Sequence, residues 1–302
     1  MESVFLLKIY FCISCSSFYV KIDLDVMEEF MDTKKLMDIA LELSGLEKVP
    51  YDSGVQVEGD NLKKILIGID METPELLLAK ELGYDCVISH HPKAESSTVN
   101  FSKVMDVQID KMVSFGVPIN KAQKMLRKKQ ASVELSGHVG NYDRHASAAR
   151  LLNMPYMNIH LPADIITEAI VQKHLDTAFE NNNNKTLGDV LDVLNNMDAY
   201  KDALAGPVIR VGSKTDYAGK IAVLMAGGTN GGTDVIKSYF EAGVGTIICM
   251  HVPEDVKKAV MEQNIGNVIV AGHMASDSIG LNVIIDAWEK EGLEVTKMSG
   301  IL

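Results

Sequence analysis

Three short stretches of the sequence combine imidazole and carboxylate side chains at spacings that suit a metal site. They are His90-His91, His160-x-x-x-Asp164 and His273-x-x-x-Asp277. A helix that begins near Ser276 would place His273 and Asp277 one turn apart at its N-terminus, where they can converge on one point. Imidazole and carboxylate ligands without thiolate suit Zn²⁺, Mn²⁺, Fe²⁺, Co²⁺ or Ni²⁺.

The number of these side chains points to more than one ion. A single metal needs three or four protein ligands, whereas this set offers five or six. Two ions about 3.5–4 Å apart, sharing a carboxylate and a water, can lower the pKa of that water and stabilise an oxyanion. Each histidine alone is better explained as a cap or a hydrogen-bonded residue at the end of a strand. The three stretches together favour the metal site.

The His90-His91 pair follows an apolar run, residues 84–89, and precedes Pro92. That run predicts a buried strand, which ends before the proline. Neighbouring side chains of a strand point to opposite faces, so the two imidazoles can meet one ligand only where the chain turns. Further predicted strands at residues 154–159 and 267–271 lead into the other two stretches. The carboxyl ends of parallel strands are where α/β proteins place their ligands.

Strands and helices alternate from Thr33 onward, which predicts an α/β fold with a mostly parallel sheet. A strand at residues 64–70 precedes a helix that starts at Thr73-Pro74, and a helix at residues 102–115 precedes a short strand at residues 117–120. We expect residues 31–180 to form the first α/β half, with a helical insertion at 121–153. Residues 181–302 would form the second half, because the asparagine run at 181–184 indicates an exposed boundary.

The two halves show an internal repeat. Residues 81–91 parallel residues 241–251 at a constant offset of 160, which also places Gly68 on Gly228 without a gap. The repeat predicts two related halves. In the second half the histidine pair has become Met250-His251.

Two further features allow alternative interpretations. The insertion carries five basic residues, which form either a solvated helix face or a patch that faces phosphate: Lys121, Lys124, Arg127, Lys128 and Lys129. Residues 227–232 read Gly-Gly-Thr-Asn-Gly-Gly before a predicted helix. This loop either receives an anion at the helix N-terminus or is a flexible turn.

Composition narrows the class of protein. The chain of 302 residues is 47% hydrophobic and 23% charged, as expected of a globular protein. A net charge of −12 argues against general DNA binding. The four cysteines form no disulfide framework, and Cys86 and Cys249 fall in predicted buried strands. Reduced thiols predict a cytoplasmic location.

Residues 1–30 form an apolar extension that Lys8 interrupts, with neither a signal-peptide pattern nor a clear membrane span. We expect an upstream start codon, with the protein proper beginning at Met27 or Met31; a weak anchor is the alternative. The spacing of Cys12 and Cys15 matches a redox motif, but no βαβ unit surrounds it, so we attribute it to chance.

Four segments together resemble one family across Met31 to Leu302. They are Ser89-His90-His91-Pro92, residues 158–164 (Asn-Ile-His-Leu-Pro-Ala-Asp), Gly227-Gly228 and residues 271–277 (Ala-Gly-His-Met-Ala-Ser-Asp). In order and spacing they are similar to the GTP cyclohydrolase I type 2 homologue family, the Nif-three-like dinuclear metal proteins.

This resemblance implies two divalent metal ions per chain, in the cleft between two related α/β domains with mixed, mostly parallel sheets. It also implies a ring-shaped homohexamer. It carries ligand roles onto five residues and places His160 in or beside the ligand set: His90, His91, Asp164, His273 and Asp277.

The sequence departs from the family pattern at three places. Asp277 stands where the family has glutamate, so a bridging role requires its helix to sit closer. The long insertion makes Asp143 a rival of Asp164, although a predicted strand leads directly to the motif of Asp164. His251 replaces what is often an acidic residue, so it adds a ligand or a proton-transfer group.

These features predict a metal-dependent hydrolase in which a metal-bridging hydroxide attacks the substrate and His160 or His251 moves the proton. The family name suggests a small-molecule substrate, a nucleotide or related heterocycle, although the sequence has no Gly-x-x-x-x-Gly-Lys loop for phosphates. Two alternatives remain: a metal-binding regulatory protein that acts through a hexameric assembly, and a dimetal phosphoesterase. We expect no membrane association.

Overall fold

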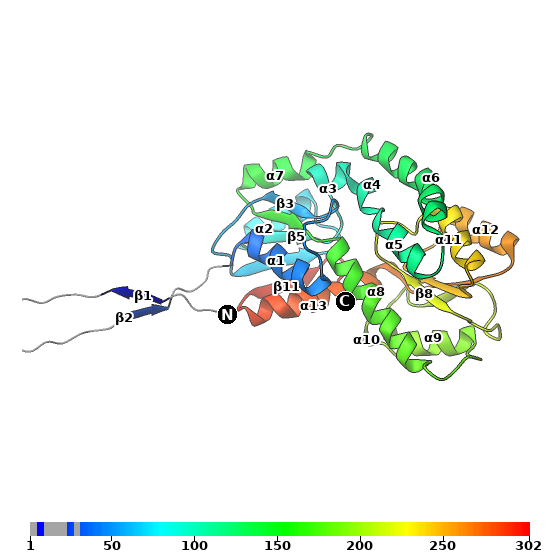
Figure 1. Ribbon diagram of the computed structural model, residues 1–302. Helices are drawn as coiled ribbons and strands as arrows, with labels where there is room; N and C mark the ends of the chain where they lie inside the picture. Colours follow the sequence, from blue (N-terminus) through cyan, green and yellow to red (C-terminus); the bar gives the residue numbers. More distant parts are fainter. Residues whose placement is uncertain (1–4, 9–22, 27–30) are drawn as a thin grey trace, which may run out of the picture.

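The computed structural model describes residues 5–8, 23–26 and 31–302. Two β-sheets with helices on both faces stand side by side (Figure 1). Strands β1 (Phe5–Lys8) and β2 (Asp23–Val26) form a separate antiparallel pair. Cys12 and Cys15 lie outside the described residues, and the expectations for residues 1–30 stay predictions.

The first sheet has five strands, four of them parallel. Their order is β11 (Glu294–Met298), β4 (Lys64–Gly68), β5 (Cys86–Ser89), β6 (Tyr156–Asn158) and β3 (Gly54–Val57). β3 is the antiparallel edge strand, and β11 pairs in parallel with β4. Apolar residues of β4 and β5 are buried on both faces of the sheet, as in parallel sheets that helices cover on both sides.

The second sheet has the order β7 (Val208–Val211), β10 (Asn267–Val270), β9 (Thr246–Cys249) and β8 (Ile221–Leu224). Its strands β8, β9 and β10 are parallel and β7 is antiparallel. The expected α/β class with mixed, mostly parallel sheets is confirmed. The domain boundaries proposed from the sequence stay predictions.

Helices pack on both faces of the first sheet. One face holds α1 (Thr33–Ser44), α8 (Leu161–Ala178) and α13 (His273–Lys290), and the other holds α2 (Thr73–Glu81) and α7 (Arg144–Leu152). Two helices continue from one sheet to the other. Ala163 and Ile166 of α8 pack on the first sheet, whereas Val171 and Leu175 of the same helix pack on the second. The beginning of α13 packs on the second sheet and its later turns on the first.

The remaining helices cover the second sheet or connect the two. One face packs against α5 (Val107–Ser114), α6 (Ile119–Gly137), α11 (Gly232–Glu241) and α12 (Glu254–Gln263); the other packs against α9 (Leu187–Asn195) and α10 (Asp198–Lys201). The short helices α3 (Glu95–Val99) and α4 (Phe101–Val104) lead into α5. In Figure 1, α6 runs along the upper edge of the molecule, from the helices that cover the second sheet back toward α7.

The expected insertion consists of α6 and α7, but the strand expected at residues 117–120 is wrong. Val117 is buried in a loop and α6 begins at Ile119, directly after Pro118. Proline has no N–H to donate to a sheet, and its fixed φ suits the start of a helix. The helix expected at residues 102–115 is interrupted between α4 and α5.

The internal repeat is real in topology, but its ungapped alignment is correct only in part. The units β4–α2–β5 and β8–α11–β9 occupy equivalent places, and β5 and β9 differ by the expected offset of 160. Gly68 pairs with Ser89, however, whereas Leu224 pairs with Cys249. The counterpart of Gly68 is therefore Leu224 and not Gly228, because the second unit has four additional residues (228 − 224 = 4) before β9.

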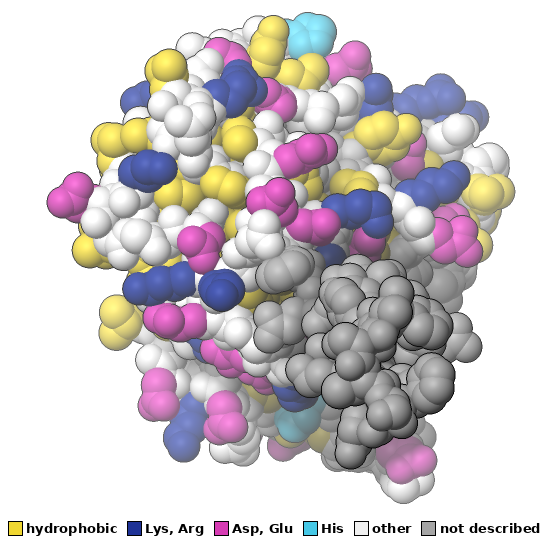
Figure 2. Space-filling view, turned by 90° about the vertical axis from the view of Figure 1, so that its left-hand side faces the viewer, with side chains coloured by type: hydrophobic (Ala, Val, Ile, Leu, Met, Phe, Trp, Pro, Cys, Tyr) yellow, Lys and Arg dark blue, Asp and Glu magenta, His cyan; other side chains and the backbone are white. Residues whose placement is uncertain are grey.

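Charged side chains of both signs are interspersed with hydrophobic ones on the face shown in Figure 2. Within the described part of the chain, none of the helices combines the length and the apolar character that crossing a membrane requires. The mixture of charges on the face shown in Figure 2 differs from the large patch of one sign that a polyanion-binding surface presents.

The helices α8 and α13 approach each other closely at Gly280. A Cβ atom at this position would lie 2.0 Å from the backbone oxygen of Ala163. The Thr167 hydroxyl crosses the same contact: it accepts a hydrogen bond from Gly280 N and donates one to Ser276 O, both at 2.9 Å. Only glycine permits this separation of the helices.

We therefore expect Gly280→Ala to lower the free energy of unfolding by about 3 kcal/mol, because a new methyl group must push against backbone. Chemical denaturation measures this change. Gly140→Ala is the control, because a Cβ there meets no atom within 4 Å, and it should stay within about 0.5 kcal/mol of the parent. Alanine otherwise favours helices over glycine by about 1 kcal/mol, so a stabilised Gly280→Ala variant would contradict the close contact.

Candidate metal centre

The ends of strands and the starts of helices position the candidate ligands. His90 and His91 directly follow β5, where their backbone N–H groups donate to Gly68 O and Ile69 O, each at 2.9 Å. His160 is the N-cap residue of α8, and His273 is the first residue of α13. These positions at the carboxyl ends of parallel strands are those expected for ligand sites in α/β folds.

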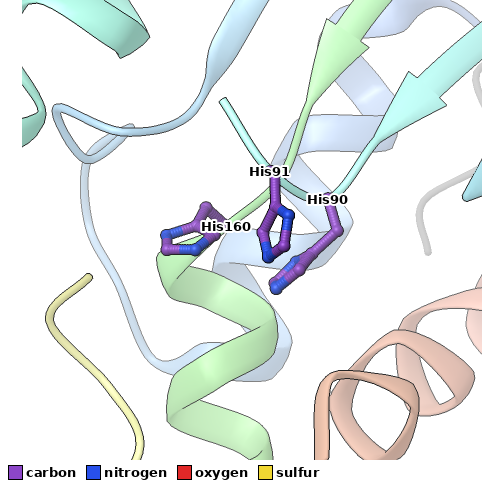
Figure 3. Close-up of side chains that lie close together, drawn as sticks. All are labelled: His90, His91 and His160. Atoms are coloured by element: carbon purple, nitrogen blue, oxygen red, sulfur yellow. The ribbon is translucent and has the colours of Figure 1, made fainter. Parts of the chain in front are cut away.

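The histidine rings gather around one point. Figure 3 shows His90 and His91 at the end of β5 with the His160 ring beside them at the start of α8. The ring centroid of His90 lies 5.1 Å from that of His91 and 4.8 Å from that of His160. His273 joins from α13, with its ring centroid 5.1 Å from that of His91. Four imidazoles from distant parts of the chain thus form one cluster.

Two buried carboxylates complete the cluster. Asp164 Oδ1 lies 3.4 Å from His90 Nε2. Asp277 is central: its Oδ1 lies 3.6 Å from His90 Nε2, and its Oδ2 lies 3.6 Å from His91 Nε2 and 3.5 Å from His273 Nε2. One carboxylate therefore faces two different groups of imidazoles, as a bridging ligand must.

Three of the imidazoles are oriented from behind by hydrogen-bond acceptors. The Nδ1–H groups of His90, His91 and His160 donate to Ile159 O at 2.9 Å, Asp70 Oδ1 at 2.9 Å and Asp52 Oδ2 at 2.7 Å, respectively. A proton held on Nδ1 leaves Nε2 as the free nitrogen of the ring. Metal-binding histidines in proteins typically have such a partner.

Polar atoms at the centre of the cluster are buried without hydrogen bonds. His90 Nε2, Asp164 Oδ1 and both carboxylate oxygens of Asp277 have no such partner among the described residues. Each buried polar atom left unpaired costs about 1–3 kcal/mol. The cluster contains three sets of three residues in which each residue offers one ligand atom and these atoms lie within 4.8 Å of one another. Each set could hold a metal ion. The donor set therefore fits divalent metal ions.

The charges in the cluster also favour a cation. Burial opposes the charge of His90, but attraction to Asp277 and Asp164 outweighs it and holds the pKa of His90 well above its ordinary value. Burial, together with the charges of His90 and His160, lowers the pKa of His91 to about 4. The carboxylates thus attract positive charge to the centre, and a divalent ion would supply it in place of a proton.

The two sheets contribute equivalent motifs to the site. His160 and Asp164 open the helix that follows β6, and His273 and Asp277 open the helix that follows β10. His251 follows β9 as His91 follows β5, and its ring centroid lies 5.0 Å from that of His273. His251 is thus at the edge of the cluster, outside the groups of converging ligand atoms in the described chain.

The structure brings together the five residues expected as ligands and His160. It places Asp143 elsewhere, exposed before α7 in an ion pair with Arg150. The sequence interpretation missed Asp52 and Asp70. Asp70 ends the predicted strand 64–70 and was recognisable by that position, whereas Asp52 lies in a loop without any signal.

A cavity of about 500 Å³ opens beside the cluster. Cluster residues form one wall, and the second sheet and α6 supply the residues opposite, among them Lys129, Asn230, His251 and the buried Cys249. Cavities of this size bind small molecules.

The fold and this cluster define a mixed α/β protein with a site suited to metal ions. A family model described as Duf34/NIF3 (NGG1p interacting factor 3) matches residues 31–300. The chain therefore belongs to the Duf34/NIF3 family, and the family resemblance seen in the sequence is confirmed. Among curated proteins, no sequence matches the chain.

Solved structures agree with this assignment. The crystal structure of a NIF3 superfamily protein from Sphaerobacter thermophilus is 38% identical, with a TM-score of 0.87, over 89% of this chain and 98% of its own. Reduced HcgD from Methanocaldococcus jannaschii (13% identity, TM-score 0.56) and TTHA1606 from Thermus thermophilus (18%, 0.52) share the fold over the same fractions.

Asp52 offers a test of how the site is oriented. Asp52→Asn removes the charge that holds His160 Nδ1–H, so we expect divalent-metal affinity to fall at least about tenfold. Metal titration with a competing chelator measures this. Asp202→Asn is the control, because Asp202 is exposed at the end of α10. An Asp52→Asn variant with parental affinity would show that Asp52 does not orient the site.

Proposed function

We propose that this protein is a dinuclear-metal-dependent hydrolase. One observation carries the proposal: both oxygens of the buried Asp277 carboxylate lack hydrogen bonds within the described chain and face imidazoles on two sides. A single metal ion can be bound through one carboxylate oxygen. A carboxylate that bridges two ions needs both of its oxygens.

Two groups of residues would hold the ions. His90, Asp164 and Asp277 have ligand atoms within 4.8 Å of one another, and so do His91, His273 and Asp277. Asp277 belongs to both groups and would bridge them. His160, which forms a third such group with His90 and His91, would complete or border the ligand set. The close packing of α8 and α13 at Gly280 would help Asp277 to serve where the family resemblance implies the longer glutamate.

Two divalent ions held by these residues would supply Lewis-acid chemistry, which polarises a substrate oxygen and lowers the pKa of a bound water. The chain itself supplies the groups that move protons. His160 is held through Nδ1 by the buried Asp52, which leaves its other nitrogen for proton transfer beside His90 and His91. His251 borders His273 and is exposed to the cavity, so it can exchange a proton with solvent. Histidines in such positions act as general acids and bases.

The cavity supports a small-molecule substrate, and we propose a nucleotide or related heterocycle. Its volume of about 500 Å³ suits a molecule of that size. Phe101 lines the cavity with its ring centroid 5.5 Å from that of His160. An aromatic face beside the cluster offers a stacking surface to a planar ring.

Assembly and location complete the proposal. We propose a homohexamer in the cytoplasm. Three exposed leucines support association, because an interface would remove their apolar surface from water: Leu77 and Leu78 of α2, and Leu82 directly after it. The two buried free cysteines, Cys86 and Cys249, support a reducing compartment. Light scattering of the purified protein should give the mass of six chains; a monomer would contradict the assembly.

Metal stoichiometry tests the site directly. We expect about two divalent ions per chain by elemental analysis of protein purified without chelator, and one or fewer in Asp277→Asn, because the shared carboxylate loses its charge. Asp143→Asn, at the rival position, should keep the parental content. Equal losses in the two variants would argue against a bridging Asp277.

Turnover tests the hydrolase. We expect the metal-loaded protein to hydrolyse a member of a panel of GTP, cyclic nucleotides and related heterocycles with Mn²⁺, Zn²⁺ or Fe²⁺. His160→Gln should lower the rate about 10²-fold or more at unchanged fold, as loss of a general acid–base group does. A protein that binds two ions but converts no compound of the panel would count against the enzyme.

A further inference from the structure

Two sequence features outside the histidine–aspartate cluster line the same cavity. One is the glycine-rich loop of residues 225–232, between β8 and α11. The other is Lys129, from the basic run of α6. Each had two interpretations in the sequence, a ligand contact or a plain structural role. Because both features lie beside the candidate metal centre, their position favours a ligand contact for each.

The glycine-rich loop is held in place by two side chains, the buried Gln108 and the partly buried Glu168. Glu168 Oε2 accepts hydrogen bonds from the N–H groups of Met225 at 2.8 Å and Ala226 at 3.0 Å. Gln108 Nε2 donates to Gly227 O at 2.9 Å and Thr229 O at 2.6 Å. These bonds fix both ends of the segment 225–229, so the loop is not a flexible turn.

Fixed in this way, the loop keeps several donors free. Within the described part of the chain, the backbone N–H groups of Gly228, Thr229 and Asn230 have no hydrogen-bond acceptor. The Asn230 Nδ2 group is buried and also lacks a partner there. Asn230 Oδ1 accepts from Gly232 N at 3.0 Å, which sets the orientation of the amide. All three residues line the cavity, so these unused donors lie in or close to its wall.

Lys129 brings a positive charge to this wall. A Cβ atom at Gly232 would lie 3.4–3.6 Å from the Cβ, Cγ and Cδ atoms of Lys129, so the lysine stem runs along the loop. Lys129 forms no ion pair with the described residues. Lys121, by contrast, pairs with Glu241. Lys124, Arg127 and Lys128 are exposed, as on a solvated helix face. Lys129 alone among the five reaches the cavity.

We propose that this cavity binds a phosphoryl group between the Lys129 ammonium and the N–H groups of residues 228–230. The group would anchor a substrate whose reacting part lies at the metal centre. This last part rests on the hydrolase proposed above. Three backbone donors, one amide and one ammonium suit the three terminal oxygens of a phosphoryl group better than the two of a carboxylate.

Calorimetry with inorganic phosphate tests the anchor. We expect Lys129→Gln to weaken phosphate binding about tenfold or more, the effect of losing one charge-assisted hydrogen bond. Lys128→Gln, the exposed neighbour on the same helix, should stay within about twofold of the parent. Asn230→Leu should weaken binding several-fold by removing the amide donor. Circular dichroism confirms that each variant is folded.

The titrations are done on the full chain, once loaded with metal and once after chelation, with acetate as a second probe. Equal phosphate affinity of Lys129→Gln and Lys128→Gln in both states would overturn the anion site. Acetate that binds as tightly as phosphate would overturn the phosphoryl assignment. If the chain cannot be loaded with metal but still binds phosphate through Lys129, the anion site is supported while the dinuclear hydrolase is contradicted.

Discussion

The packing of α8 against α13 is the contact on which the site depends. Each helix begins with a histidine and carries an aspartate one turn later, and each begins next to a different sheet. The absent side chain of Gly280 and the two hydrogen bonds of Thr167 set how near the helices come. That distance decides whether Asp164 and Asp277 reach the same histidine. The geometry of the cluster therefore depends on this one tightly packed contact between two helices.

The equivalent motifs of the two sheets explain both the symmetry of the site and its limits. Either half offers a strand followed by a helix with His-x-x-x-Asp, so doubling the unit brings two carboxylates to one centre. The two halves differ, however, in the side chains that surround these motifs. His90 has only Met250 as its counterpart, and Asp52 supports His160 from behind. The first half therefore supplies more of the candidate ligands than the second, and the cavity opens between them and the second sheet.

The convergence of these side chains was predictable from the sequence, because they follow strand ends, and strand ends are visible as apolar runs that stop at glycine, proline or a polar residue. Their roles as ligands stay predictions. The fold class followed from the same alternation. Asp52 was not predicted, because it lies in a loop and its hydrogen bond to His160 exists only in the folded chain. The alignment of Gly68 with Gly228 failed because the four additional residues of the second unit fall in a glycine-rich segment, where similarity of composition hides a shift of register. Spacing also could not show which of the five basic residues on α6 reaches the cavity, because this depends on how the helix packs against the rest of the fold.

Cys249 has a consequence for the kind of ion that the protein can select. Cys249 lines the cavity together with histidine and aspartate residues of the cluster. Burial raises the pKa of the Cys249 thiol to about 12, so it stays protonated at neutral pH. A protonated thiol is a poor nucleophile and a poor ligand. In the absence of a bound metal the cavity therefore offers no thiolate, and the charged and imidazole ligands that it presents come from histidine and aspartate alone among its described lining residues.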